Sequence, residues 1–275
     1  MPKEIERKFL VIGDFRRSGQ PVLYRQGYLN TDPLRTVRVR CAGDNAWLTV
    51  KGKTVGFSRD EFEYPIPITE AKELIGLCEG SIVEKYRHMV ESGGLTWEVD
   101  EFRGENEGLV IAEIELESEG VRFTLPDWTG REVTGDLRFY NSNLSECPYR
   151  QWIDSGVIIF HLTTRRDLES ARAAGSYTAP SLEDKGFIHC SRASQVADTA
   201  NLLFAGRDNL IVLHIDTTLV DADIRYEEPA HEGHGPDVER SFPHIYGPLN
   251  LEAVAGVEPL RRTEDGSFRF TARDS

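Results

Sequence analysis

The sequence lacks several features that mark whole classes of proteins. Its four cysteines are scattered and form no CxxC pair. This favours isolated thiols in a reducing compartment over a disulfide framework or a zinc site. No apolar run approaches the roughly 18 to 20 residues that span a bilayer, so we expect no membrane partner. The N-terminus, MPKEIERKFLV, is charged from its third residue and does not resemble a signal peptide, so we expect a cytoplasmic protein.

Basic residues are also in deficit. The chain holds 32 Lys and Arg against 46 Asp and Glu, which gives a net charge of -14. Neither half has the basic footprint of a nucleic-acid-binding protein, so we expect no nucleic-acid partner. An acidic protein that binds a phosphate-rich ligand needs local basic clusters, divalent cations or both. The sequence gives no indication of the oligomeric state.

Two patterns of residues divide the 275-residue chain. Residues 1–147 read mostly as strands, because polar and apolar residues alternate in segments such as TVRVR (36–40), TWEVDEF (96–102) and LVIAEIELE (109–117). Residues 148–156 read as a linker. Residues 157–262 mix strands and helices and predict a smaller α+β domain. Residues 263–275 are polar, and we expect this tail to lack fixed structure.

Charged residues recur two positions apart in the first half, which places each set on one face of its strand. Most sets are of one sign. They are Glu4/Glu6/Lys8, Arg38/Arg40, Glu61/Glu63, Lys85/Arg87, Glu98/Asp100 and Glu113/Glu115/Glu117, with Lys51 alone in its strand.

Two arrangements explain this ladder of charges. A sheet with one solvated face gives the same alternation, with cross-strand ion pairs between acidic and basic strands. Alternatively, the sheet closes with its polar face inward and forms a tunnel lined by carboxylates and cations. Carboxylates suit Mg²⁺ or Mn²⁺, and Arg and Lys suit phosphate oxygens, which is the combination that metal-assisted phosphoryl transfer requires.

A set of motifs in the first half resembles the CYTH superfamily, the triphosphate tunnel metalloenzymes. The opening EIERKFLV is similar to the ExExK signature of that family. The motifs that follow, in the expected order, are QGYL (26–29), TVRVR, LTVKG, DEFEYPIP, EKYRH, WEVDEF, AEIELE and VTGDLRFYNSNL (133–144). Together they resemble the short bacterial branch, whose characterised members are similar to inorganic tripolyphosphatases.

The resemblance implies an eight-stranded antiparallel β-barrel whose tunnel holds a triphosphate, with a few helices. It implies that carboxylates bind a divalent ion, Mg²⁺ or Mn²⁺, through Glu4, Glu6, Glu113 and Glu115. Glu61 and Glu63 would hold a second ion or orient the attacking water. Lys8 would contact a phosphate oxygen at the reacting centre. The residues implied to grip the triphosphate are Arg38, Arg40, Lys51, Lys85 and Arg87.

The activity implied is hydrolysis of inorganic tripolyphosphate to pyrophosphate and phosphate. Two alternatives stay open. The substrate could be an organic triphosphate, as in thiamine triphosphatases, nucleoside triphosphatases or class IV adenylate cyclases. The domain could also be a non-catalytic triphosphate sensor whose output is the second domain. Tyr28 lies in QGYL, where packing with a satisfied hydroxyl is favoured over contact with substrate.

The second half resembles a bacterial family of unknown function that is grouped with the ADP-ribosyltransferase superfamily. The motifs that carry this resemblance are IFHLTT (159–164), GFIHCS (186–191) and ERSFPHIYGPL (239–249). It implies an NAD-binding cleft, with His161 as the first contact, His189 and Ser191 as the second, and Glu239 or Glu227 as a late acid. No clear motif surrounds either acid, so a binding or regulatory module is the alternative. His161 also lies in an apolar strand, where a satisfied core histidine is common.

Overall fold

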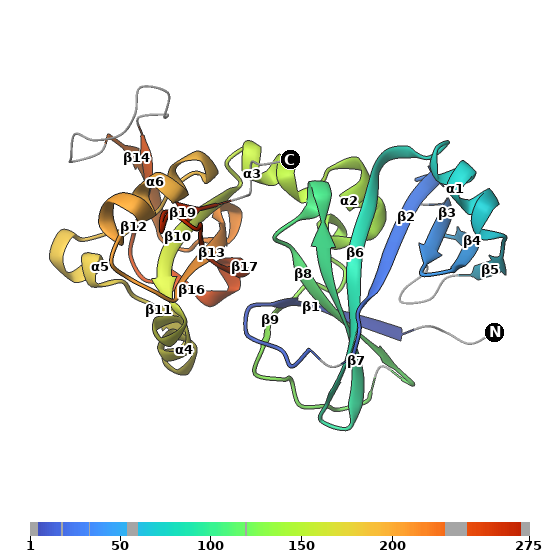
Figure 1. Cartoon of the computed structure of the whole chain (residues 1–275). Helices are drawn as coiled ribbons and strands as arrows, with labels where there is room; N and C mark the ends of the chain where they lie inside the picture. Colours follow the sequence, from blue (N-terminus) through green and yellow to red (C-terminus); the bar gives the residue numbers. More distant parts are fainter. Residues whose placement is uncertain are drawn as a thin grey trace. The chain divides into compact units, whose positions relative to one another are not determined.

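The computed structural model describes residues 5–17, 19–32, 34–53, 60–118, 120–228 and 241–270. The chain divides into two compact units, Met1–Tyr149 and Arg150–Ser275 (Figure 1). Two predicted site residues, Glu4 and Glu239, lie outside the described residues. Within the described ranges, every helix is too short or too polar to cross a membrane.

The first unit is built on one antiparallel sheet. Its strand order is β5-β4-β3-β2-β6-β7-β8-β1-β9. The strands are β1 (Ile5–Val11), β2 (Val22–Asn30), β3 (Arg35–Ala42), β4 (Asn45–Gly52), β5 (Glu61–Pro65), β6 (Glu79–Ser92), β7 (Leu95–Arg103), β8 (Val110–Leu116) and β9 (Thr129–Glu132). Most neighbours are consecutive in sequence, but the β1–β8 pairing joins segments that lie about a hundred residues apart, as in the pair Lys8 and Glu113. The predicted α+β class with a large antiparallel sheet is confirmed.

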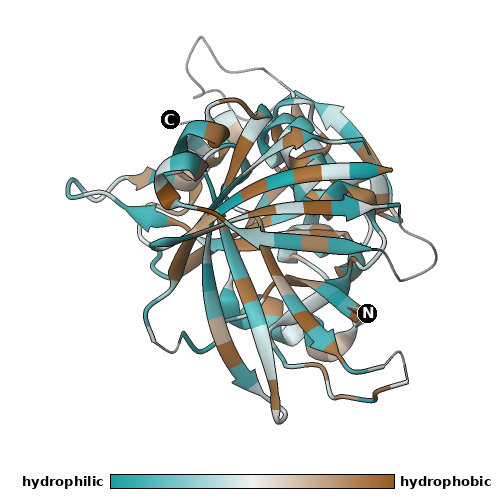
Figure 2. Ribbon diagram, turned by 90° about the vertical axis from the view of Figure 1, so that its right-hand side faces the viewer, coloured by the Kyte–Doolittle hydropathy of each residue, from teal (hydrophilic) through white to brown (hydrophobic). Residues whose placement is uncertain are grey.

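Hydrophilic and hydrophobic residues alternate along these strands (Figure 2). The apolar face is covered in two places. Phe9 and Trp97 pack with their ring centroids 5.7 Å apart, and Phe123, from the segment after β8, packs against both. Helix α1 (Ile68–Ile75) buries Ala71 against Val39 of β3. Because the apolar face is covered, the polar face is left to form a site.

The polar face itself changes character along the strands. On β1, the face that carries Lys8 continues with Leu10, which is fully buried and lies opposite Ile111 of β8. On β6, Lys85 lies opposite the buried Phe102 of β7. Apolar side chains therefore close one end of this face, and charged side chains occupy the rest.

Helix α2 (Asn141–Glu146) packs against β6 at a position that requires glycine. The Ser145 hydroxyl donates to the carbonyl oxygen of Ser81 over 2.7 Å. Gly80 has a φ of +69°, and a Cβ there would lie 2.7 Å from the carbonyl oxygen of Ser145. Two short 3-10 helices, η1 (Gly104–Asn106) and η2 (Leu137–Phe139), complete the unit.

The second unit contains several small antiparallel sheets and short helices. Its sheets are β10 (Ile158–Thr164), β13 (Leu210–Asp216) and β17 (Val254–Pro259); β12 (Ile188–His189), β15 (Phe242–Tyr246) and β14 (Asp223–Glu227); β11 (Ser176–Tyr177) and β16 (Leu249–Asn250); and β18 (Arg261–Arg262) and β19 (Phe268–Arg269). Its helices are α3 (Tyr149–Asp154), α4 (Arg165–Ala174), α5 (Pro180–Lys185), α6 (Ala193–Leu203), η3 (Thr217–Leu219) and η4 (Leu251–Ala253).

Local sequence explains where α4 begins and ends. The Thr164 side chain accepts a hydrogen bond from the backbone N–H of Asp167, and Gly175 ends the helix with a φ of +82°. Two segments differ from the expected domain boundaries. The expected linker 148–156 contains α3, and Phe268, in the tail expected to lack fixed structure, is buried.

Candidate functional site

A cavity of about 860 Å³ lies on the polar face of the first unit. Its lining residues come from eight strands, β1 to β8, and from the segment 134–142, so the sheet curls around it. The ninth strand, β9, extends the sheet beyond β1. The resemblance implied eight strands, and the sheet has one more; β5 and β9 are its ends, and among the described residues no pairing joins them.

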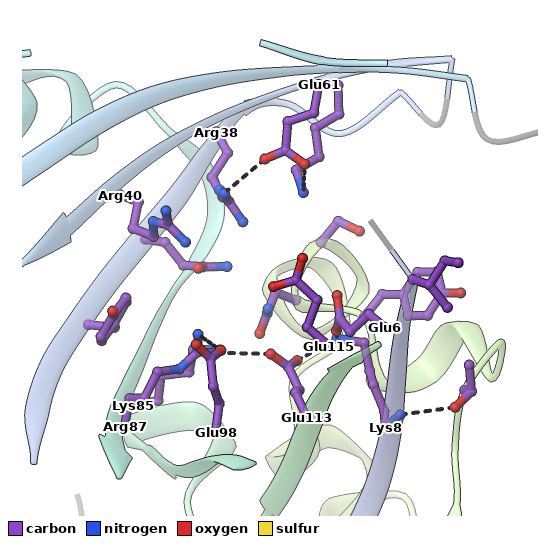
Figure 3. Close-up of a pocket in the computed structure, with 18 of the residues that line it drawn as sticks. Glu6, Lys8, Arg38, Arg40, Glu61, Lys85, Arg87, Glu98, Glu113 and Glu115 are labelled. Atoms are coloured by element: carbon purple, nitrogen blue, oxygen red, sulfur yellow. Dashed lines mark hydrogen bonds and ion pairs between the residues drawn. The ribbon is translucent and has the colours of Figure 1, made fainter. Parts of the chain in front are cut away.

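Twelve charged side chains line the cavity, six of each sign. The basic ones are Lys8, Arg38, Arg40, Lys51, Lys85 and Arg87, and the acidic ones are Glu6, Glu61, Glu63, Glu98, Glu113 and Glu115. Apart from Glu4, every site residue predicted for this unit is among them. Figure 3 shows Arg38 and Glu61 across the cavity from Glu113 and Glu115.

One network of ion pairs joins β3, β4 and β5. Lys51 lies 2.8 Å from Glu61, its partner in the β4–β5 register. Arg40 donates to Glu63 over 3.0 Å, and the same carboxylate accepts from the Thr49 hydroxyl. Burial and then the neighbouring Arg38 lower the pKa of Arg40, although Glu63 acts in the opposite direction. This network, together with Arg38, is called the Arg40 network below.

A second network centres on Arg87 of β6. Its guanidinium donates to both oxygens of Asp100, at 2.7 and 2.6 Å, to Glu113 at 2.9 Å, and to Glu98. Burial alone would lower the pKa of Arg87, but Asp100 and the other two carboxylates raise it well above its ordinary value. Arg87 is therefore a permanent cation held by three acids.

Lys85 and Asp100 form the most deeply buried pair of this second network. Their side chains are 2% and 0% exposed. Burial outweighs the attraction of Asp100 and lowers the pKa of the Lys85 ammonium. The Lys85 Nζ also lies 5.3 Å from the ring centroid of Phe102, one of the apolar residues that close the polar face. The pair thus marks the boundary between the charged and apolar parts of that face.

Lys8 extends the second network to β1. Its ammonium pairs with Glu6 and with Glu113. Burial acts to lower the pKa of Lys8, but the two carboxylates raise it above its ordinary value. Burial likewise acts to raise the pKa of Glu113, yet Lys8, Lys85 and Arg87 hold it well below its usual range. The set Lys8, Lys85, Arg87, Glu6, Glu98, Asp100 and Glu113 is called the Arg87 network.

The acidic end of the cavity has the chemistry of a site for a hard divalent ion. Glu6 and Glu115 lie directly opposite in the β1–β8 register, where like charges destabilise a sheet unless a cation lies between them. Within the described residues, the Glu115 carboxylate has no hydrogen bond or ion pair with another side chain, and no three His, Cys, Asp or Glu side chains, as now placed, form a group that could hold a metal ion.

Several cavity residues were not identified from the sequence. Tyr24 and Gln26 precede Tyr28 at the same two-residue spacing on β2, which is the signal that could have found them. Asn141 and Ser142 lie within the VTGDLRFYNSNL motif but were given no role. The Tyr28 hydroxyl accepts from the Gln26 amide over 3.1 Å, and Tyr28 is 5% exposed, which favours the packing interpretation.

The predicted residues of the second unit come together in part. The His161 Nδ1 donates to the carbonyl oxygen of His189 over 2.6 Å, and its Nε2 lies 2.7 Å from the Tyr177 hydroxyl. Burial lowers the pKa of His161 to about 4 and raises that of Tyr177 to about 12. Ser191 is buried, with its hydroxyl 3.4 Å from that of Thr199. Because both nitrogens of His161 are bonded, the structure favours a core histidine.

A second histidine cluster lies on the sheet β12–β15–β14. The Glu227 carboxylate accepts from the His244 Nδ1 and from the Tyr246 hydroxyl, both at 2.8 Å. The ring of Phe187 stacks on that of His244 with the centroids 4.1 Å apart, and the ring of His189 contacts that of His244 edge-on with the centroids 5.1 Å apart. Burial raises the pKa of the neighbouring Cys190 thiol, which agrees with an inert thiol.

Comparison with known proteins gives two family matches. The CYTH domain model matches residues 2–143, and the model described as a protein of unknown function, DUF952, matches residues 162–257. That description includes no link to ADP-ribosyltransferases or NAD, so both stay predictions.

Two curated relatives are named inorganic triphosphatase. One, from Acetivibrio thermocellus, is 56% identical over 154 residues, which are 55% of this chain and 99% of that protein. The other, from Nitrosomonas europaea, is 38% identical over 147 residues, 52% of this chain and 96% of that protein. The crystal structure of the inorganic triphosphatase NE1496 is 36% identical and covers 53% of this chain and 95% of its own, with a TM-score of 0.44.

Proposed function

This chain belongs to the CYTH domain family, and on that premise we propose that its first unit hydrolyses inorganic tripolyphosphate to pyrophosphate and phosphate. The observation that carries the proposal is the cavity, which six basic and six acidic side chains line together. The names of the two curated relatives support the same reaction.

The basic side chains match the charge and shape of a linear polyphosphate. Tripolyphosphate carries several negative charges, and planar guanidinium groups donate two hydrogen bonds to phosphate oxygens at once. Arg38, Arg40 and Lys51 approach from one part of the sheet, and Lys85 and Arg87 from another. A chain of three phosphates bound between these groups would replace some of their present carboxylate partners.

The acidic side chains support the metal dependence that is general for CYTH triphosphatases, and we propose Mg²⁺ or Mn²⁺ as the ion. Glu6, Glu113 and Glu115, with Glu4, would hold it, because hard carboxylate oxygens suit these ions. An ion bound between Glu6 and Glu115 would offset the repulsion between these two opposed carboxylates. When bound, the ion supplies positive charge that stabilises the phosphoryl group during its transfer.

We propose the remaining roles from the family resemblance and from the charge of each side chain. Glu61 and Glu63 would accept hydrogen bonds from the attacking water and orient it in line with the leaving group. Water attacks the terminal phosphorus, the bond from that phosphorus to the bridging oxygen breaks, and pyrophosphate leaves. Lys8, whose raised pKa keeps it charged, would donate to a phosphate oxygen that gains charge in this step.

Phosphate release from tripolyphosphate, ATP and thiamine triphosphate tests the proposal, with each substrate assayed in Mg²⁺, in Mn²⁺ and in chelator. We expect metal-dependent release that is fastest for tripolyphosphate. Faster phosphate release from an organic triphosphate would mean that this compound, and not tripolyphosphate, is the substrate. Tight binding of tripolyphosphate without turnover would mean that the first unit is a triphosphate sensor and not an enzyme.

A further inference from the structure

The ion pairs of the cavity fall into two networks separated by a neutral strand. The Arg40 network lies on β3, β4 and β5, and the Arg87 network lies on β1, β6, β7 and β8. Between them in the sheet lies β2, whose cavity-facing side chains are Tyr24, Gln26 and Tyr28. These side chains carry no formal charge at neutral pH. A polyphosphate that spans the cavity must therefore be contacted by cations from both sides of a neutral strip.

Tyr24 is the side chain on this strip that contacts a cation of each network. The guanidinium carbon of Arg87 lies 5.0 Å from the centroid of its ring, and that of Arg40 lies 5.8 Å away. Tyr24 is half-buried, lines the cavity, and lies opposite Lys85 in the β2–β6 register. In Figure 3, the two arginines lie on the same side of the cavity.

The two arginines repel each other, and a neutral ring is suited to hold them together. Burial and then Arg38 lower the pKa of Arg40, and Arg87 acts in the same direction, so the two charges are within electrostatic reach. The face of an aromatic ring attracts a guanidinium without neutralising it. A carboxylate in this position would instead compete with phosphate for both arginines.

We propose that Tyr24 is a positioning residue that orients Arg40 and Arg87 toward the same polyphosphate chain. The inference rests on the proposed function for its ligand. Holding both guanidiniums in place before binding reduces the rotamer freedom that each would otherwise lose when the anion binds. The ring, and not the hydroxyl, carries this role.

The test compares Tyr24→Leu and Tyr24→Phe with a matched control. Tyr86→Leu is that control, because Tyr86 is also half-buried and lies 5.4 Å from the guanidinium of Arg103, but it does not line the cavity. Two quantities are measured: the Kd of tripolyphosphate by calorimetry, in chelator and in Mg²⁺, and the kcat and KM of its hydrolysis.

We expect Tyr24→Leu to raise the Kd and KM about tenfold, because two arginine side chains that the ring no longer holds must then be immobilised on binding, with a much smaller change in kcat. Tyr24→Phe should restore both quantities to near the wild-type values, and Tyr86→Leu should match wild type. The proposal is overturned if Tyr24→Leu binds like wild type, if Tyr24→Phe is as impaired as Tyr24→Leu, or if Tyr86→Leu shows the same loss.

The two proposals fail in different ways. If wild type binds tripolyphosphate but does not hydrolyse it, the proposed function is wrong, and the Kd values of the three variants still decide the role of Tyr24. If wild type does not bind tripolyphosphate in either condition, both proposals are wrong.

Discussion

The two units bury titratable groups in opposite ways. In the first unit, Lys85, Arg87 and Asp100 are buried as charges, and each charge is held by an opposite one. In the second, His161 is buried in its neutral form, held by a backbone carbonyl and the Tyr177 hydroxyl. Buried charges are costly, whereas a neutral hydrogen-bonded ring is an ordinary core element.

This difference separates a site from a core. Lys85 and Arg87 of the first unit line a cavity, and the proposed function requires an ion or a polyanion to exchange with the present ion-pair partners there. His161 has both ring nitrogens engaged, and its strand β10 is buried along almost all of its length. The functional evidence therefore lies in the first unit, and the difference between the two units can be tested by substitution.

The largest effect is expected from Asp100→Asn, which removes the carboxylate that pairs with both Lys85 and Arg87. Breaking a buried pair in this way costs about 3 to 5 kcal/mol in the free energy of unfolding, measured by chemical denaturation. Glu84→Gln is the control, because it removes the exposed Arg25–Glu84 pair and should cost less than about 1 kcal/mol. Equal losses of unfolding free energy in the two variants would show that the buried ion pairs of the first unit contribute no more to stability than an exposed pair.

The next effect is expected from Glu6→Gln, which keeps the size of the side chain and removes its charge. Loss of one group that stabilises charge at a reacting centre lowers kcat about 100- to 1,000-fold, so metal-dependent phosphate release should fall by this factor without unfolding the sheet. Glu132→Gln removes a glutamate paired with Arg7 that lies outside the cavity, and should retain activity. Full activity in Glu6→Gln would exclude Glu6 as a ligand of the ion.

The smallest effect concerns pH and the second unit. Burial lowers the pKa of His161 to about 4 from 6.5, so between these values the unfolded chain binds more protons than the folded one. The stability that His161 contributes is therefore present above about pH 6.5 and is lost as the pH falls toward 4. We expect it to amount to ~3 kcal/mol.

Denaturation of wild type and His161→Gln from pH 7 to pH 4 measures this contribution. The unfolding free energy of the variant should lack this part of its decrease as the pH falls. Cys190→Ala is the control, because its thiol does not titrate in this range, and its curve should run parallel to that of wild type. Parallel curves for wild type and His161→Gln would mean that the histidine is not buried as a neutral group.

Much of the cavity could be predicted because each strand carries its pattern locally. A spacing of two fixes which side chains share a face, so sets such as Arg38/Arg40 and Lys85/Arg87 were assigned together from sequence. Their pairing could not be predicted from spacing, since Lys8 meets Glu113 only through the β1–β8 register. Tyr24 was missed because, although it shares the two-residue spacing of β2 with Gln26 and Tyr28, it carries no charge that would mark it as part of the ladder.

The strands, the alternation of their faces and the charged residues on one of those faces could all be predicted from the sequence. Whether that face meets solvent or a cavity could not be predicted, and the cross-strand ion pairs expected for a solvated face are indeed present. The packing distinguishes the two arrangements, because α1 and the segment around Phe123 cover the apolar face. Burying the apolar surface leaves the charged face to curl around the cavity, and that choice depends on contacts between segments far apart in the chain.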